Sequence, residues 1–427
     1  MQAGTIRNRR QLTADAYTIA IIYVKPIEMG AITAMIDEFH LPIPLHISDT
    51  NEYTLGRIGS HNVAIAGPAK GMQGKVAIAS VATRIPFTFR NIRISLVVGI
   101  GGGIPRSNRD VRLGDVVVGA PEYGDAVVQY DLGKEYTHRM VSSRSLNKPP
   151  DILLRVVDRV NDEYHRAKLG EDLFDIHMKQ FEKFPKIKEQ YQRPKAVDRL
   201  FKPDFEHSGS PYACHPEGTT YAGDTSSCSE YNSSNEVRRE PREPGLGGIK
   251  IHYGTILSGD RVMKSGKKRD EIASNYPNAL CFEMEAAGVM NDLPCLVIRG
   301  ICDYSDSHKN KEWQGYAAAT AASYAREVLL TMAERVGGDL DGRTNTGLPS
   351  RSVTWPSADT NDKNTPSQPL WGGDYFDNPL FTPPSSGSQT PTHALWGGDF
   401  FDGPQFKPLT STMGMRKTYT YYREGPI

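Results

Sequence analysis

The sequence predicts an α/β protein built around a buried, partly parallel sheet. Short β-branched runs alternate with stretches whose apolar residues recur every three or four positions. The first strand is predicted at residues 17–24, and a helix follows from Pro26, whose missing N–H needs no partner in a first helical turn. One face of that helix is marked by four apolar residues, Ile32, Met35, Ile36 and Phe39. Such alternation is typical of layered α/β folds.

The later part of the chain continues this alternation. Further strands are predicted from short apolar runs at residues 93–98, 116–118, 251–257, 279–282 and 295–299. The first of these leads into a glycine-rich loop at residues 99–105. Residues 151–162 carry a helical apolar pattern after two prolines, and the alanine-rich stretch 316–336 predicts a long helix.

Composition divides the chain into three regions. Residues 1–16 form a polar, basic arm that we expect to be disordered, and residues 17–337 form the α/β domain, with an insertion at about residues 134–248. Residues 338–427 are rich in Ser, Thr, Pro, Gly and Asp, which predicts a disordered tail. The tail repeats one motif, LWGGDYFD at residues 370–377 and LWGGDFFD at residues 395–402. The repeat suits a docking motif for a protein partner; a β-stacking segment and a duplication without a role are the alternatives.

Charge and cysteine content limit which partners and which cellular compartment we expect. The 50 basic and 50 acidic side chains balance, so the composition predicts no nucleic-acid partner and no anionic membrane partner. We see no signal peptide and no apolar run long enough to cross a bilayer. An odd number of cysteines, 5, favours a reducing compartment, and we expect a cytoplasmic protein. Cys214, His215 and Cys228 match no common zinc spacing, so we predict no metal.

Acidic residues cluster near the predicted strand ends. Glu28 lies in the first turn of the first helix, and Asp303 lies just past the strand at residues 295–299. Glu283 and Glu285 lie where another strand gives way to a helical turn. Because open α/β sheets bind ligands at the carboxyl ends of their strands, these acids are candidates for a site. Helix-dipole and capping roles are the structural alternatives for each of them.

The glycine-rich segment at residues 99–104 has two interpretations. It follows a strand, as a dinucleotide-binding fingerprint does, but it ends in Pro105 and polar residues and has no acidic residue at the expected place on a second strand. Close approach of the backbone to a flat base or a sugar explains the glycines as well. No dinucleotide cofactor is therefore predicted.

The order of these segments resembles the nucleoside phosphorylase/nucleosidase superfamily, which includes purine and uridine phosphorylases and methylthioadenosine/S-adenosylhomocysteine nucleosidases. The resemblance covers about residues 17–336, and the nearest branch is the fungal one with a long insertion. The segments that carry it are IAII at 19–22 with Glu28, GMQGKVA at 71–77, VVGIGGGI at 97–104, LGDVV at 113–117, YGTILSGD at 253–260, FEMEAA at 282–287 and RGICD at 299–303. It implies a three-layer αβα sandwich with a mixed, twisted sheet.

The resemblance also implies how the site cleaves the bond between a purine and ribose. Positive charge grows on the sugar and negative charge on the base, so an acid is needed beside the base. That acid is implied to be Asp303, which protonates purine N7, while Glu28 and Arg299 hold the attacking water. Contacts to the substrate are implied for a further set of residues: Glu285 on the ribose hydroxyls, Met284 under the sugar, Phe282 near the base, and Gly101 and Gly102 along the base pocket.

Water is favoured over phosphate as the acceptor. Family phosphorylases hold phosphate with arginines, and Val97 and Val98 stand where one is expected, while Lys25 and Pro26 follow the first strand. Phosphate is a dianion that needs compensating charge. No cofactor is predicted, although a phosphorylase would use inorganic phosphate as co-substrate. We also expect a homo-oligomer.

Two further alternatives concern the substrate and the activity. A purine nucleotide could replace the nucleoside, with Lys75, Lys309 and Lys311 as candidate 5′-phosphate ligands; the alternative for these lysines is a solvated surface. A signalling or interaction module that keeps the fold but little turnover is the alternative to an enzyme.

Overall fold

The structure is a computed structural model that describes residues 9–137, 139–142, 145–167, 172–206, 233–242, 248–309 and 311–333. All of these belong to one unit, Met1–Arg343. The predicted tail with its repeated motif lies outside the described residues, as do residues 1–8 and the segment with Cys214, His215 and Cys228.

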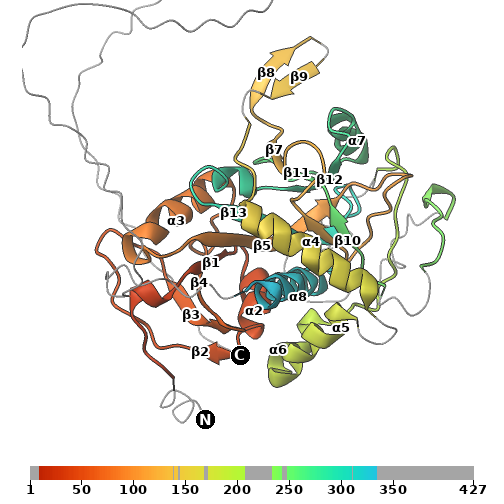
Figure 1. The fold of residues 1–427 in the computed structure, drawn as a ribbon. Helices are drawn as coiled ribbons and strands as arrows, with labels where there is room; N and C mark the ends of the chain where they lie inside the picture. Colours follow the sequence, from red (N-terminus) through yellow and green to blue (C-terminus); the bar gives the residue numbers. More distant parts are fainter. Residues whose placement is uncertain are drawn as a thin grey trace, which may run out of the picture. The chain divides into compact units, whose positions relative to one another are not determined.

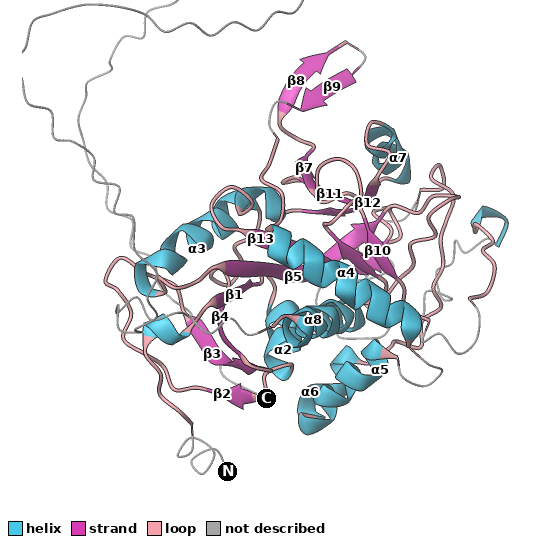
Figure 2. Ribbon diagram, viewed as in Figure 1, coloured by secondary structure: helices cyan, strands magenta, loops and turns pink. Residues whose placement is uncertain are grey.

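A mixed sheet of 11 strands forms the centre of the described part (Figures 1 and 2). Its strands are β1 (Ile19–Ile22), β2 (Glu38–Phe39), β3 (Tyr53–Ile58), β4 (His61–Ala66), β5 (Ile94–Gly103), β6 (Val116–Val118), β7 (Val127–Gln129), β10 (Ile251–Tyr253), β11 (Thr255–Ser258), β12 (Ala279–Glu283) and β13 (Cys295–Asp303). Strand β5 lies between β1 and β13 and is parallel to both, whereas β12 pairs with its glycine-rich end in the antiparallel direction. A separate hairpin consists of β8 (Gly133–Tyr136) and β9 (Arg139–Ser142).

Helices cover the sheet in the order α2 (Pro26–Ala34), α3 (Lys75–Thr88), α4 (Asp151–Arg166), α5 (Leu173–Met178), α6 (Pro185–Tyr191), α7 (Gly266–Ser274) and α8 (Gln314–Thr331). Short 3₁₀ turns are η1 (Ala14–Ala16), η2 (Lys179–Lys183), η4 (Ser233–Asn235) and η5 (Ala286–Gly288). No helix of the described residues combines the length and the apolar character needed to cross a bilayer.

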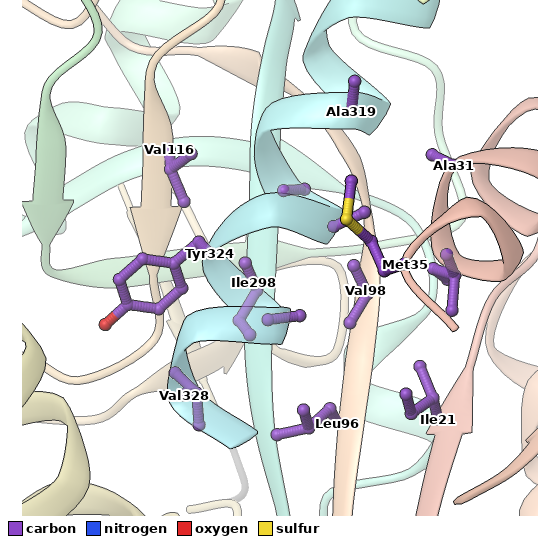
Figure 3. Close-up of a cluster of buried hydrophobic side chains, with 14 of the residues drawn as sticks. Ile21, Ala31, Met35, Leu96, Val98, Val116, Ile298, Ala319, Tyr324 and Val328 are labelled. Carbon is purple, nitrogen blue, oxygen red and sulfur yellow. The ribbon is translucent and has the colours of Figure 1, made fainter. Parts of the chain in front are cut away.

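Side chains alternate between the two faces of the central strands and so build two cores. On one face Ile21, Leu96 and Ile298 pack with α2 and α8 (Figure 3). Their chain neighbours on the other face, Ile22 and Val97 among them, pack with α3. Because a strand turns successive side chains to opposite faces, helices are needed on both sides. The predicted αβα sandwich with a mixed sheet is therefore confirmed.

The close packing of α8 explains why it contains so many alanines. Nearly all of its residues are buried between the sheet and the other helices. At Gly300 of β13, an added methyl group would collide with the backbone of Ala317, so helix and strand are in close contact. Small side chains permit this approach, and alanine also has the highest helix propensity.

Three helices in the region predicted as an insertion pack on the domain itself. Residues Leu153, Val156, Val157 and Val160 on the predicted face of α4 are buried in the same core as α8. Helices α5 and α6 lie beside α8 as well (Figure 1). These helices thus extend one helical layer of the sandwich, and the projecting part is the β8–β9 hairpin (Figure 1).

Three local predictions are corrected. The first helix ends at Ala34, and Phe39 lies on the edge strand β2, where it pairs with Gly56. The glycine-rich segment is not a loop, since residues 99–103 continue β5. Of the arm predicted to be disordered, residues 9–16 contact the domain: Leu41 N donates to Arg10 O at 2.8 Å. In each case a partner distant in sequence decides the conformation.

Candidate active site

Two glycines of β5 let side chains from other elements meet at its end. A methyl group at Gly99 would collide with the guanidinium of Arg299 and the carboxylate of Glu28. One at Gly102 would collide with the hydroxyl of Ser305. Because these glycines have no side chains, polar groups from α2, β13 and the loop after β13 occupy the space beside β5.

Glu28 anchors α2 to the sheet. Its Oε2 accepts the N–H groups of Val24 and Lys25 at 2.9 and 2.8 Å, and its Oε1 accepts the Ile100 N–H at 2.9 Å. The residue is only 3% exposed, and its bond to the Lys25 N–H is the capping role that was one of its structural alternatives. These bonds use three of the roughly four acceptor positions of a carboxylate, which leaves about one for a water or a substrate.

Arg299 is held by acids of β12 and the turn after it. Its guanidinium forms an ion pair with Glu283 and lies 3.9 Å from the carboxylate of Glu285. Glu283 also accepts the N–H groups of Glu285 and Ala286, at 3.1 and 2.9 Å. Arg299 is 1% exposed. Its main partner is thus Glu283, and sequence analysis did not predict this pairing, because the two residues meet across the glycine-rich end of β5.

Glu285 titrates near neutral pH. Burial, followed by repulsion from Glu283, raises its pKa to about 7, although Arg299 opposes the shift. Its side chain is 9% exposed and lines the cavity described below. A carboxyl group with such a pKa is present in both forms at pH 7. The neutral form can donate a hydrogen bond to a sugar hydroxyl, and the carboxylate can accept one from it.

Asp303 is the last residue of β13, which continues four residues beyond the predicted strand end at Arg299. Its Oδ2 lies 2.8 Å from Nζ of Lys309, and its Oδ1 accepts the N–H of Ser305 at 2.9 Å. Sequence analysis assigned Lys309 to a phosphate or to solvent. Of the other candidate lysines, Lys75 pairs with Asp131 at 2.5 Å.

These groups surround one cavity of about 60 Å³. The predicted site residues that line it are Glu28, Gly101, Gly102, Phe282, Met284 and Glu285. Arg299 and Asp303 are not among the lining residues; Arg299 lies behind Glu283 and Glu285, and Asp303 lies behind Lys309, which does line the cavity.

A second cavity of about 320 Å³ adjoins the first, with Arg261, Val262 and Met263 lining both. Ligand pockets usually measure about 300–1,000 Å³, so the first cavity alone is small for a nucleoside. Lys264 and Lys268 line the second cavity, next to the first turn of α7. The shared segment thus lies between a cavity lined by both acidic and basic residues and one whose charged lining residues are all basic.

No family model matches the chain, but curated relatives do. A nucleotide-binding leucine-rich repeat (NLR)-like protein of Hyaloscypha variabilis is 37% identical over 324 residues, 75% of this chain and 30% of that protein. The chain therefore spans under a third of the length of that relative. A 5′-methylthioadenosine/S-adenosylhomocysteine nucleosidase of Mycobacterium bovis is 23% identical over 320 residues, 74% of this chain and 96% of the relative.

A shorter match is to the ATP nucleosidase Cap17 of Escherichia coli, 31% identical over 87 residues, 19% of this chain and 17% of that protein. The M. bovis match extends over nearly the whole nucleosidase and most of the described domain. Together with the glycine-rich β5, the FEMEAA segment and the αβα sandwich, these relationships support the predicted resemblance to the nucleoside phosphorylase/nucleosidase superfamily.

Proposed function

We propose that the protein cleaves the N-glycosidic bond of a purine nucleoside or nucleotide, with water as acceptor. The observation that carries this proposal is one cavity lined by Glu28, Glu285, Met284 and the backbone of Gly101 and Gly102, with Asp303 behind its wall. Such a site has acidic groups for the sugar on one side and a proton donor for the base on the other. The names of the M. bovis and E. coli relatives support this reaction.

Each group has a place in the proposed reaction. Glu28 orients the attacking water with its remaining acceptor position, and Arg299 keeps the acids around the sugar in place. Glu285 binds the ribose hydroxyls, and Met284 packs under the ring. Phe282 and the glycines border the base. On the far side Asp303 passes a proton to purine N7, so that the base departs without net negative charge.

Charge balance supports water rather than phosphate. The guanidinium of Arg299 is already compensated by Glu283 and Glu285. The ammonium of Lys309 is compensated by Asp303. Lys25 and Arg261 also line the cavity, but a phosphate dianion there would face the carboxylates of Glu28, Glu283 and Glu285, which makes its burial costly.

The second cavity favours a substrate with an anionic 5′ substituent. We place the base and ribose in the first cavity and the substituent in the second, past a displaced Arg261–Met263 segment. Arg261, Lys264 and Lys268 would then face the phosphates, although Lys268 is also paired with Glu271 at 2.7 Å. The relative named as an ATP nucleosidase agrees with this placement.

Incubation with adenosine, inosine, AMP and ATP, with and without inorganic phosphate, tests the proposal. Chromatography should show a free purine base in phosphate-free buffer, with AMP or ATP turned over faster than adenosine. Release that requires phosphate and yields ribose 1-phosphate would identify a phosphorylase instead.

The second candidate function is an interaction module with little turnover, which the NLR-like relative favours. It predicts that the wild type and the Asp303→Asn variant release bases equally poorly from every substrate in the panel. A clear difference between the two proteins would exclude it.

A further inference from the structure

The proposed leaving-group acid is shielded from solvent by a lysine. The side chain of Asp303 is 2% exposed, whereas that of Lys309 is 25% exposed and lines the cavity. Their charged atoms are 2.8 Å apart. An acid that gives up a proton in every turnover must regain one, and Asp303 has little direct access to water.

The loop after β13 is shaped to return Lys309 to Asp303. Ser305 has a φ of 56°, a left-handed conformation that is uncommon for residues other than glycine, and it is buried. This turn lets the Ser305 N–H reach Asp303 Oδ1, and Asp306 O accepts the Lys309 N–H at 3.4 Å. The turn therefore fixes the Lys309 ammonium opposite the carboxylate.

Two segments of the insertion hold the same loop from outside. The hydroxyl of Tyr304 donates to Asp198 Oδ1 at 2.5 Å and accepts from Arg239 Nη1 at 2.7 Å. The ring of His308 stacks on Phe201 with the centroids 4.0 Å apart. Residues on both sides of the loop are thus clamped, which restricts Lys309 to the neighbourhood of Asp303.

The surroundings of Lys309 keep it charged in the resting protein. Burial opposes the ammonium form, but Asp303, Cys302 and Asp306 raise the pKa of Lys309 above its usual value. Asp306 is itself buried, and burial raises its pKa to about 6. Charged groups also line the cavity walls that Lys309 faces: Lys25, Glu28, Arg261, Glu283 and Glu285.

We propose that Lys309 supplies the proton that Asp303 passes to the leaving purine, and that Lys309 then regains a proton from solvent in the cavity. As the C1′–N9 bond breaks, its electron pair moves to the base, and N7 takes a proton from the Asp303 carboxyl. The Lys309 ammonium gives a proton to Asp303 in the same step. Water adds to C1′ and loses a proton to Glu28, which releases it to solvent, so the products are a neutral purine and ribose that keeps any 5′ substituent.

The basicity of the leaving group makes this transfer feasible. A lysine is a weak acid toward a neutral nucleoside, so it does not protonate the bound substrate prematurely. The departing purine carries growing negative charge and becomes a far stronger base as the bond breaks. A donor and an acceptor of similar basicity at that moment give efficient proton transfer.

The inference rests on the proposed hydrolysis, and two variants test it. Lys309→Arg keeps the charge and the ion pair, but a guanidinium does not give up its proton. We expect its kcat at pH 7.5 to fall by about 10²-fold, with KM changed only a few-fold. In Lys309→Gln, Asp303 must be protonated by solvent, so kcat should fall steeply as pH rises from 5 to 8, whereas the wild-type kcat stays nearly constant.

Lys186→Arg and Lys186→Gln are matched controls, because Lys186 is exposed on α6, away from the cavity. Circular dichroism and melting temperatures confirm folding of each variant. A Lys309→Arg enzyme with wild-type kcat overturns the inference, and so does a Lys309→Gln enzyme faster than wild type at pH 7.5, which would make Lys309 a restraint. A wild-type protein that releases no base refutes the proposed function itself, before any variant is compared.

Discussion

Two buried aspartates beside β13 show how one residue type serves different purposes. Asp115 lies just before β6, which pairs with β13, and it is 0% exposed. Arg242 binds both of its oxygens, and His252 Nε2 lies 2.8 Å from Oδ2. The backbone N–H groups of Arg112 and Lys250 also donate to it. Asp303, at the end of β13, has fewer donors: the Lys309 ammonium, the Ser305 N–H and the thiol of Cys302, whose Sγ lies 3.0 Å from Oδ2.

The difference lies in how completely each carboxylate is satisfied. Asp115 connects the ends of several segments, including the insertion through Arg242. Its several hydrogen-bond donors stabilise the carboxylate form, so it is not suited to proton exchange. Asp303 faces a single ammonium that itself reaches solvent. A buried acid with saturated partners fixes architecture, whereas one with a mobile proton partner is suited to chemistry. The following predictions test this contrast.

The largest effect is expected for Asp303→Asn. The amide still accepts the Ser305 N–H but cannot pass a proton to the base, so purine release should fall by about 10³-fold. Its free energy of unfolding should change less than that of the Asp115→Asn variant below. Rate measurements with the best substrate of the panel, together with urea unfolding, check both parts; a variant with near-normal release would assign the acid role elsewhere.

Asp115→Asn should reverse this pattern. Removal of one partner from a buried ion pair leaves Arg242 without compensation and costs about 3–5 kcal/mol of stability. The matched control is Asp158→Asn, since Asp158 is exposed on α4. Urea denaturation measures the cost. A loss below about 1 kcal/mol would show that the Asp115 cluster is not the anchor described above.

Acidification should weaken the Asp115 anchor. Burial would raise the pKa of Asp115, but the hydrogen bonds from Arg242 and His252 outweigh it, so the pKa is lowered from its usual value of 3.8. A lowered folded-state pKa stabilises the fold above the unfolded-state value, and this stabilisation disappears as pH falls below about 4. The stability difference between wild type and Asp115→Asn should therefore be constant from pH 5 to 7 and shrink below pH 4. A difference that grows on acidification would contradict the assignment.

Most strands and helices could be predicted from the sequence because they depend on local apolar patterns. Val116–Val118 matches its predicted strand, and the buried face of α4 follows its apolar spacing. The glycine-rich end of β5 was predicted as a loop because glycine disfavours strands locally. The space beside Gly99 is filled by Arg299 and Glu28, which no local pattern reveals.

The residues of the candidate site could be predicted from the sequence, but the contacts between them could not. Motif order located the acids and glycines that line the cavity. The pairings among them depend on which strands are neighbours: Glu283 reaches Arg299 across β5, and Lys309 reaches Asp303 through the left-handed turn at Ser305. Neither contact has a signal in the sequence spacing, since each depends on a conformation set by tertiary packing.

The smallest expected effect concerns Glu285 and separates sugar binding from proton transfer. Burial and Glu283 raise its pKa to about 7, so the carboxylate form prevails above pH 7 and the neutral form below it. Hydrogen bonds to an ionised acceptor exceed neutral ones by roughly 1 kcal/mol, so KM should fall about fivefold as pH rises from 6 to 8.

Glu285→Gln keeps the size and the acceptor oxygen but has no proton to lose, and its KM should stay flat over this range at the higher value. Asp306→Asn is the matched control, because the pKa of Asp306 is also raised, to about 6, in the loop beside Lys309. If Asp306→Asn rather than Glu285→Gln flattened the KM profile, the titrating group that senses the substrate would lie on the Asp303 side of the cavity. Sugar binding would then be assigned to Glu28 and Arg299 alone, and Glu285 would have no role in binding the ribose hydroxyls.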